Sequence, residues 1–108
     1  MSQLVREYHC ALRRLHRTTE RARRKLIRTC DKRFLNCICE CAKNVLRGHV
    51  PLTKRQLARL RQYKRSMHTL ATKKPSLKSK RRVLQKGGFI GALLAPVLSF
   101  LGGLIGRR

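Results

Sequence analysis

Twenty consecutive residues near the end of this 108-residue chain, 87–106, carry no charge, although the whole sequence has a formal net charge of +24. As a helix at ~1.5 Å per residue, this segment would match the ~30 Å hydrocarbon core of a bilayer. The rest of the chain is strongly basic, since Lys and Arg number 28 against four Asp and Glu. Because the two parts favour different surroundings, the sequence divides into a basic part and an apolar tail.

The basic part allows one small domain at most. Without the tail about 86 residues remain, which give a thin core. All four acidic residues lie between Glu7 and Glu40, so the chain from Cys41 onward carries uncompensated positive charge. A compact state repels itself at this charge, and we therefore expect compaction to depend on salt or on a bound polyanion. Nucleic acid and an anionic membrane surface are the obvious polyanions.

Helical periodicity and capping residues predict short helices along the basic part. Apolar residues from 4 to 15 recur at three- and four-residue steps, and Asp31 is placed to cap a helix that Gly48 would end. The clearest start is Thr53, with Gln56 three residues later as in a capping box, and the apolar stripe behind it continues to about residue 71. The prediction is an all-α fold: three or four short basic helices in a domain of residues 1–72, a basic linker over 73–86 and an apolar C-terminal helix in a tail of residues 87–108.

The five cysteines include three at alternate positions, Cys37, Cys39 and Cys41. A structural zinc site needs four ligands that converge tetrahedrally, usually from two knuckles with a loop between them. One helix does not provide this arrangement, because Cys39 would point away from the other two and from Cys30. Since the first residues lack the apolar stretch of a secretory signal, we expect an intracellular chain with reduced thiols packed as small apolar groups. Metal binding and an intermolecular disulfide are the alternatives.

No pattern in the sequence indicates catalysis. The four histidines are scattered among cations, and the four carboxylates never pair at a spacing suited to acid–base work. No glycine-rich phosphate loop follows a strand, and no nucleophile motif is present. We therefore expect a protein that is not an enzyme and that uses no metal and no cofactor.

Positive charge spread over the whole polar part suits neutralisation of nucleic-acid phosphates, with an affinity that falls steeply with salt. Base readout is not expected, because Asn and Gln are few and only Tyr8, Phe34 and Tyr63 could stack on bases. A merely solvated surface is the alternative, but solubility requires a net charge of only ~2 to 8. The predicted nucleic-acid-binding residues are Arg55, Arg59, Arg61, Lys64, Arg65, Lys73, Lys74, Lys78, Lys80, Arg81 and Arg82.

Small residues recur every four positions in the tail, a spacing that lets helices approach closely in a membrane. Several glycines and Pro96 weaken the helix in water, and the terminal Arg107 and Arg108 are costly to translocate. A stable span, shallow insertion and membrane disruption all stay open, as does a buried core helix of the same domain. The small residues are Gly91, Ala95, Ser99 and Gly103.

The string KRRVLQKGGFI at residues 80–90, followed by ALLAP at 92–96, resembles the junction in the adenovirus protein X precursor. There an arginine-rich stretch passes through a basic residue and Gly-Gly into an apolar tail that contains proline. The stretch from Cys37 through NVLRGHVPLT at residues 44–53 to the tail resembles the protein X homologues of adintoviruses and other Polinton-like elements. The resemblance covers roughly residues 34 to 100.

This resemblance implies a minor virion or core protein that binds packaged double-stranded DNA, present in the virion and in the host nucleus during assembly. The tail would engage an anionic membrane, a capsid protein or a second copy of the chain. The runner-up is a cationic membrane-active protein such as a viroporin or lytic factor, for which anionic lipid is the polyanion. A cellular tail-anchored adaptor is a third reading.

The resemblance also implies that a viral cysteine protease cuts after Gly88. The active-site tunnel of that protease is narrow and admits only residues without side chains, which here are Gly87 and Gly88. Their position between a charged linker and an apolar segment would keep them accessible before the tail docks. Gln85 departs from the family pattern, which has a larger aliphatic residue there. The alternative is that the two glycines only form a hinge for the tail.

Overall fold

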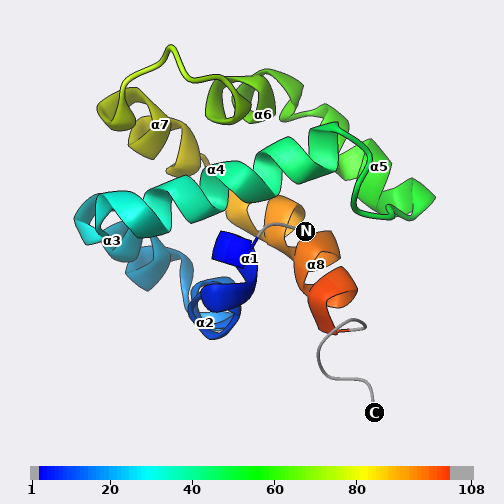
Figure 1. Cartoon of the computed structure of the whole chain (residues 1–108), viewed down its shortest axis with the longest axis horizontal. Coiled ribbons are helices and arrows are strands. Elements are labelled where there is room, and N and C mark those ends of the chain that lie inside the picture. The colour runs from blue at the N-terminus through cyan, green and yellow to red at the C-terminus, as the bar shows by residue number, and fades with distance from the viewer. Residues whose placement is uncertain (1–2, 103–108) are drawn as a thin grey trace.

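The computed structural model describes residues 3–102, which form eight α-helices and no strand (Figure 1). The fold is all-α, as the sequence predicts, but it has more helices than the three or four basic ones and one apolar helix expected. The helices are α1 (Gln3–Glu7), α2 (His9–Arg17), α3 (Glu20–Thr29), α4 (Lys32–Leu46), α5 (Lys54–Arg61), α6 (Lys64–Ala71), α7 (Leu77–Leu84) and α8 (Phe89–Leu101).

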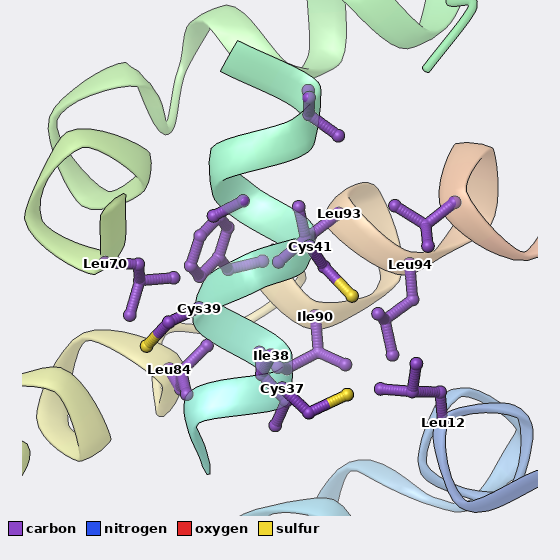
Figure 2. Packing of buried hydrophobic residues seen from close by; sticks show 14 of the residues in the cluster. Leu12, Cys37, Ile38, Cys39, Cys41, Leu70, Leu84, Ile90, Leu93 and Leu94 are labelled. Atoms are coloured by element: carbon purple, nitrogen blue, oxygen red, sulfur yellow. The ribbon is translucent and has the colours of Figure 1, made fainter. Parts of the chain in front are cut away.

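Helix α4 runs across the middle of the molecule and is buried on more than one side. In Figure 1 α6 and α7 lie above it, whereas α1, α2 and α8 lie below it. Cys39 points toward Leu70 and Leu84, while Cys41 lies on the other side, toward Leu94 (Figure 2). Cys37, Cys39 and Cys41 are all buried, so the three thiols pack in the core as small apolar groups.

The capping residues identified in the sequence begin and end helices as predicted. The side chain of Asp31 accepts a hydrogen bond from the amide of Phe34 at 2.8 Å at the start of α4. After α4 the chain turns at Gly48, whose φ of 77° favours glycine. Thr53 and Gln56 make both hydrogen bonds of a capping box, at 3.1 and 3.0 Å.

Two expected helices are each broken at a tyrosine. The segment predicted as continuous from Thr53 to about residue 71 divides into α5 and α6 at Tyr63, whose ring lies 5.1 Å from that of Phe89. The first helix divides into α1 and α2 at Tyr8, whose ring lies 5.4 Å from that of Phe34. Contacts between segments far apart in the sequence accompany both breaks. Hydrophobic periodicity is a local pattern and does not predict such contacts.

The predicted basic linker, residues 73–86, instead contains helix α7. Ser76 caps its start by accepting a hydrogen bond from the amide of Ser79 at 3.2 Å. Leu84, at the end of α7, is buried in the same hydrophobic cluster as residues of the other helices. The apolar residues of α7 pack on the domain, so the structure gives no extended linker between the basic part and the tail.

Helix α8 is a core helix of the same domain. Its side chains Ile90, Leu93 and Leu94 are 1%, 0% and 0% exposed, and α8 packs against α2, α4 and α5. Among the predicted small residues, Gly91 and Ala95 are half-buried and Ser99 is exposed, so this stripe lies toward the outside of the helix. The fourth, Gly103, lies outside the described residues.

The bulky side of α8 fills the core, which is the buried-helix alternative considered for the tail. Within residues 3–102 no single helix is long and apolar enough to cross a membrane. Helices α7 and α8 together meet that test by length and composition, but they are bent by 90° at the break between them.

Candidate nucleic-acid interface

All four acidic side chains are engaged by neighbours within the chain. Glu7 pairs with Arg33 at 2.8 Å, Glu20 pairs with Arg23 and Arg24 at 3.2 and 3.9 Å, and Glu40 pairs with Lys43 at 3.2 Å. Asp31 caps α4. Over the described range 3–102, only these four cations contact a carboxylate, and the other Lys and Arg side chains keep their charge uncompensated.

Most of the predicted DNA-contacting residues are exposed, and they lie on two parts of the chain. One group lies on α5 and α6, and a second lies on the loop before α7 and on α7 itself. Exposed cations of this kind, on two parts of the chain, suit contacts to the phosphates of the DNA backbone. The exposed residues are Arg55, Arg59, Arg61, Lys64, Arg65, Lys73, Lys74, Lys78 and Arg82.

Arg81 is one of two predicted contacts that are not freely exposed. Its guanidinium donates hydrogen bonds to the carbonyl of Ile27 at 2.8 Å and to the thiol of Cys30 at 3.5 Å. Burial raises the pKa of Cys30, and the nearby Arg81 lowers it in part. Arg81 therefore holds the end of α3 against α7 through its Nη1 atom.

Arg23 has the same structural role at the end of α2. Its guanidinium donates to the carbonyls of Leu15 at 3.1 Å and His16 at 2.8 Å, in addition to its ion pair with Glu20. Such bonds satisfy carbonyls that a helix end leaves without partners. The sequence shows Arg23 only as one cation in a basic run, so its role depends on the fold.

The junction of α5 and α6 brings basic side chains together in one shallow hollow of about 490 Å³. The hollow is lined by three predicted DNA contacts, Arg61, Lys64 and Arg65. It is also lined by Gln62 and His68, which the sequence analysis does not name as DNA contacts. His68 could have been found, because it follows Lys64 by four residues and Arg65 by three and so shares their helical face. Arg61, Lys64, Arg65 and His68 therefore lie together around one hollow of the described surface.

Two further basic hollows lie on α2 and α3, which Figure 1 places at the lower and left edges of the molecule. The hollow on α2 measures about 420 Å³ and is lined by Arg13, Arg14 and Arg17 together with Cys10 and Thr18. That on α3 measures about 440 Å³ and is lined by Arg21, Arg24 and Arg28 together with Glu20. Cationic hollows therefore occur at separate edges of the molecule.

His16 reports the strength of the positive field near α2. Burial lowers its pKa below the ordinary value of 6.5, and Arg23, Arg17 and Arg59 lower it further. Arg59 reaches this region from α5, since its Nη2 atom would lie 4.0 Å from a Cβ added at Gly91. Arg59 therefore lies beside α8 as well as on the basic surface.

The Gly87–Gly88 junction is tied to α6 in the folded chain. The hydroxyl of Tyr63 donates a hydrogen bond to the carbonyl of Gly87 at 3.0 Å, and Lys86 donates to Ser66 at 3.0 Å. Gly88 has a φ of 79°, and a Cβ added there would lie 3.0 Å from the Tyr63 hydroxyl. A protease that threads these glycines through a tunnel would first have to free them from Tyr63.

Within the described range, no group of three or more His, Cys, Asp or Glu side chains is placed to hold a metal ion. The comparisons add no relative, because no family model, curated protein or solved structure matches the chain. A function is therefore inferred from charge, geometry and the sequence resemblance described above.

Proposed function

We propose that this protein binds double-stranded DNA without sequence preference and neutralises its phosphates, as a minor virion or core protein of an adenovirus-like element. The observation that carries the proposal is the charge distribution. The net charge is +24, and all four acidic side chains are already engaged within the chain. A surface of this kind binds polyanions by releasing their counterions.

The charge also matches the length of DNA that one molecule would cover. DNA carries two phosphates per base pair at ~3.4 Å per step, so the net charge of +22 on residues 3–102, which exclude Arg107 and Arg108, balances about 11 base pairs, or ~37 Å of duplex. The longest extent of the described chain is 38 Å. One molecule would therefore neutralise a stretch of DNA about as long as itself, which suits packing DNA at high density.

The aromatic side chains support backbone binding over base readout. The rings of Tyr8 and Phe34 pack on each other, as do those of Tyr63 and Phe89. Tyr8, Phe34 and Tyr63 are partly buried, and Phe89 is fully buried. Tyr8, Phe34 and Tyr63 would have to leave these ring pairs to stack on an unpaired base, which favours contacts from Lys and Arg.

The virion setting rests on the resemblance of residues 80–90 and 44–53 to protein X-like proteins. The position of α8 weighs against the membrane-active alternative, because α8 would have to leave the core and expose Ile90, Leu93 and Leu94. A contact with capsid protein through the buried face of α8 meets the same difficulty. The proposal therefore assigns DNA to the basic surface and assigns α8 to the core.

Binding of two duplexes of unrelated sequence, measured by fluorescence anisotropy over a series of salt concentrations, tests the proposal. With six or more phosphates engaged, the slope of log K against log salt should be steeper than about −5 on both duplexes. Replacing Arg61, Lys64 and Arg65 with Gln removes three contacts and should flatten the slope by about 2.7, at ~0.9 per contact.

The matched control is Arg61→Lys with Arg65→Lys, which keeps both charges and should keep the slope. A loss of affinity confined to one of the two duplexes would indicate base readout and contradict the proposal. Binding that does not depend on salt would contradict it as well.

A further inference from the structure

We propose that the cleft between α4, α6 and α7 binds one phosphate group, held chiefly by Lys80. Lys80 is 8% exposed, the most buried Lys or Arg side chain in the described part of the chain. Among the described residues its ammonium has no carboxylate within 4.0 Å and no hydrogen-bond partner, and it is not one of the fully buried side-chain atoms, so it reaches solvent at the cleft. The stem of Lys80 is therefore packed against the core while its charge faces the cleft, where it offers an anion a positioned donor that no other group uses.

The cleft has the size and lining that a phosphate needs. Its volume is about 280 Å³, and Lys80 lines it together with Lys43 from α4 and Lys73 from the loop after α6. The side chain of Asn36 adds a neutral hydrogen-bond donor at the same cleft, whereas the Thr72 hydroxyl, which also lines it, already donates to the carbonyl of His68 at 2.6 Å. Donors of both kinds, from three separate segments of the chain, therefore surround one space.

The charge balance of the cleft favours an anion. Glu40 also lines it, but its carboxylate is paired with Lys43 at 3.2 Å. Lys73 and Lys80 then remain as two uncompensated positive charges, which match the charge of an inorganic phosphate and exceed that of a phosphodiester. Charge-assisted bonds from lysine ammonium groups are among the stronger hydrogen bonds in proteins.

Two sources could supply this phosphate: the DNA backbone and free phosphate. The DNA source rests on the proposed function, whereas the inorganic source does not. The phosphate group of an anionic phospholipid has the same chemistry, so vesicles form a third arm of the test.

The test is a titration of the full chain, with isotope-labelled lysine, followed by NMR. Inorganic phosphate is added at constant ionic strength, so that general screening of the +24 charge does not change. The side-chain resonances of Lys80 and Lys73 should shift and saturate, while that of Lys78, exposed on the same helix, should not. No saturable shift at Lys80 with phosphate, duplex DNA or phosphatidylglycerol vesicles overturns the inference.

Lys80→Met and Lys78→Met form a matched pair of variants, because Met keeps the apolar stem of lysine and removes the charge. Phosphate should raise the unfolding temperature of the parent and of Lys78→Met by the same amount, and should raise that of Lys80→Met less. If the DNA backbone is the source, Lys80→Met should weaken DNA binding several-fold more than Lys78→Met. Equal behaviour of the two variants toward all three probes overturns the inference, and should Lys80→Met not fold, the Lys80 titration of the parent decides.

Failure of this inference is distinguishable from failure of the proposed function. Salt-dependent DNA binding with an unresponsive Lys80 overturns only the phosphate cleft. Saturable phosphate binding at Lys80 without DNA binding overturns only the proposed function.

Discussion

Replacing Leu93 with Ala tests whether α8 is part of the core in solution. Leu93 is 0% exposed and lies between α8 and α4 (Figure 2). The change removes three carbon groups, worth ~2.4 kcal/mol at ~0.8 kcal/mol each. The cavity left behind raises the loss of unfolding free energy to ~2.7–5 kcal/mol. A domain of this size has a total stability of only ~5–15 kcal/mol, so the loss should be large and easily measured.

The control is Leu57→Ala, which removes the same atoms from a side chain that is 44% exposed. Because this site opens to solvent and leaves no closed cavity, we expect a loss of about 1 kcal/mol or less. Urea titrations of both variants, followed by far-ultraviolet circular dichroism in one buffer, give the two free energies.

Equal losses for Leu93→Ala and Leu57→Ala would refute the placement of α8 in the core. In that case the tail would be free to engage lipid, and flotation of the parent chain with anionic vesicles would show it. A loss at Leu93 several times that at Leu57 would leave the membrane-active alternative without its apolar segment.

The remaining predictions concern a histidine, a thiol and a glycine. Because the pKa of His16 is lowered in the folded chain, its contribution to stability is present above its unfolded value of 6.5 and is lost as pH falls below it. The urea concentration at the unfolding midpoint should therefore be lower at about pH 5.5 than at about pH 7.5. The difference between the two pH values should be smaller in His16→Gln. An aromatic disulfide reagent should label the exposed Cys10 first, and Cys10→Ser should remove this fast phase. Cys41 should react slowly, because it is buried and because its hydrogen bond with Cys37 and its burial raise its pKa well above the ordinary value. Gly88→Ala should cost ~1–2 kcal/mol of unfolding free energy because of its φ of 79°, whereas Gly87→Ala, which meets open space, should cost much less; equal losses would contradict the left-handed turn.

The all-α class and several helix ends follow from local sequence. Asp31 and Thr53 begin helices because their side chains accept bonds from amides three residues ahead, a local arrangement that sequence spacing reveals. The breaks at Tyr8 and Tyr63 accompany contacts with Phe34 and Phe89, which lie 26 residues further along in both cases. Such contacts depend on the packed fold, so periodicity could not predict them.

The surroundings of the tail and of two basic residues could not be predicted from the sequence, for the same physical reason. An apolar helix has the same sequence pattern in a membrane and in a protein core. Only the packing of α2, α4 and α5 against α8 distinguishes the two environments. Lys80 and Arg81 read as surface cations, yet one is buried and the other holds the end of α3. Composition predicts where charge is abundant, and packing determines which charges face solvent.

The contact between α2 and α8 has a consequence for how the chain is made. Residues 9–17 leave the ribosome long before residues 89–101, and the core that joins them stays open until the later segment is available. During that interval a strongly cationic nascent chain has its apolar side chains exposed, and contacts between such distant segments form slowly. We therefore expect the nascent chain to be captured early by polyanions or chaperones, so that its production in cells depends on what it meets before α8 is synthesised.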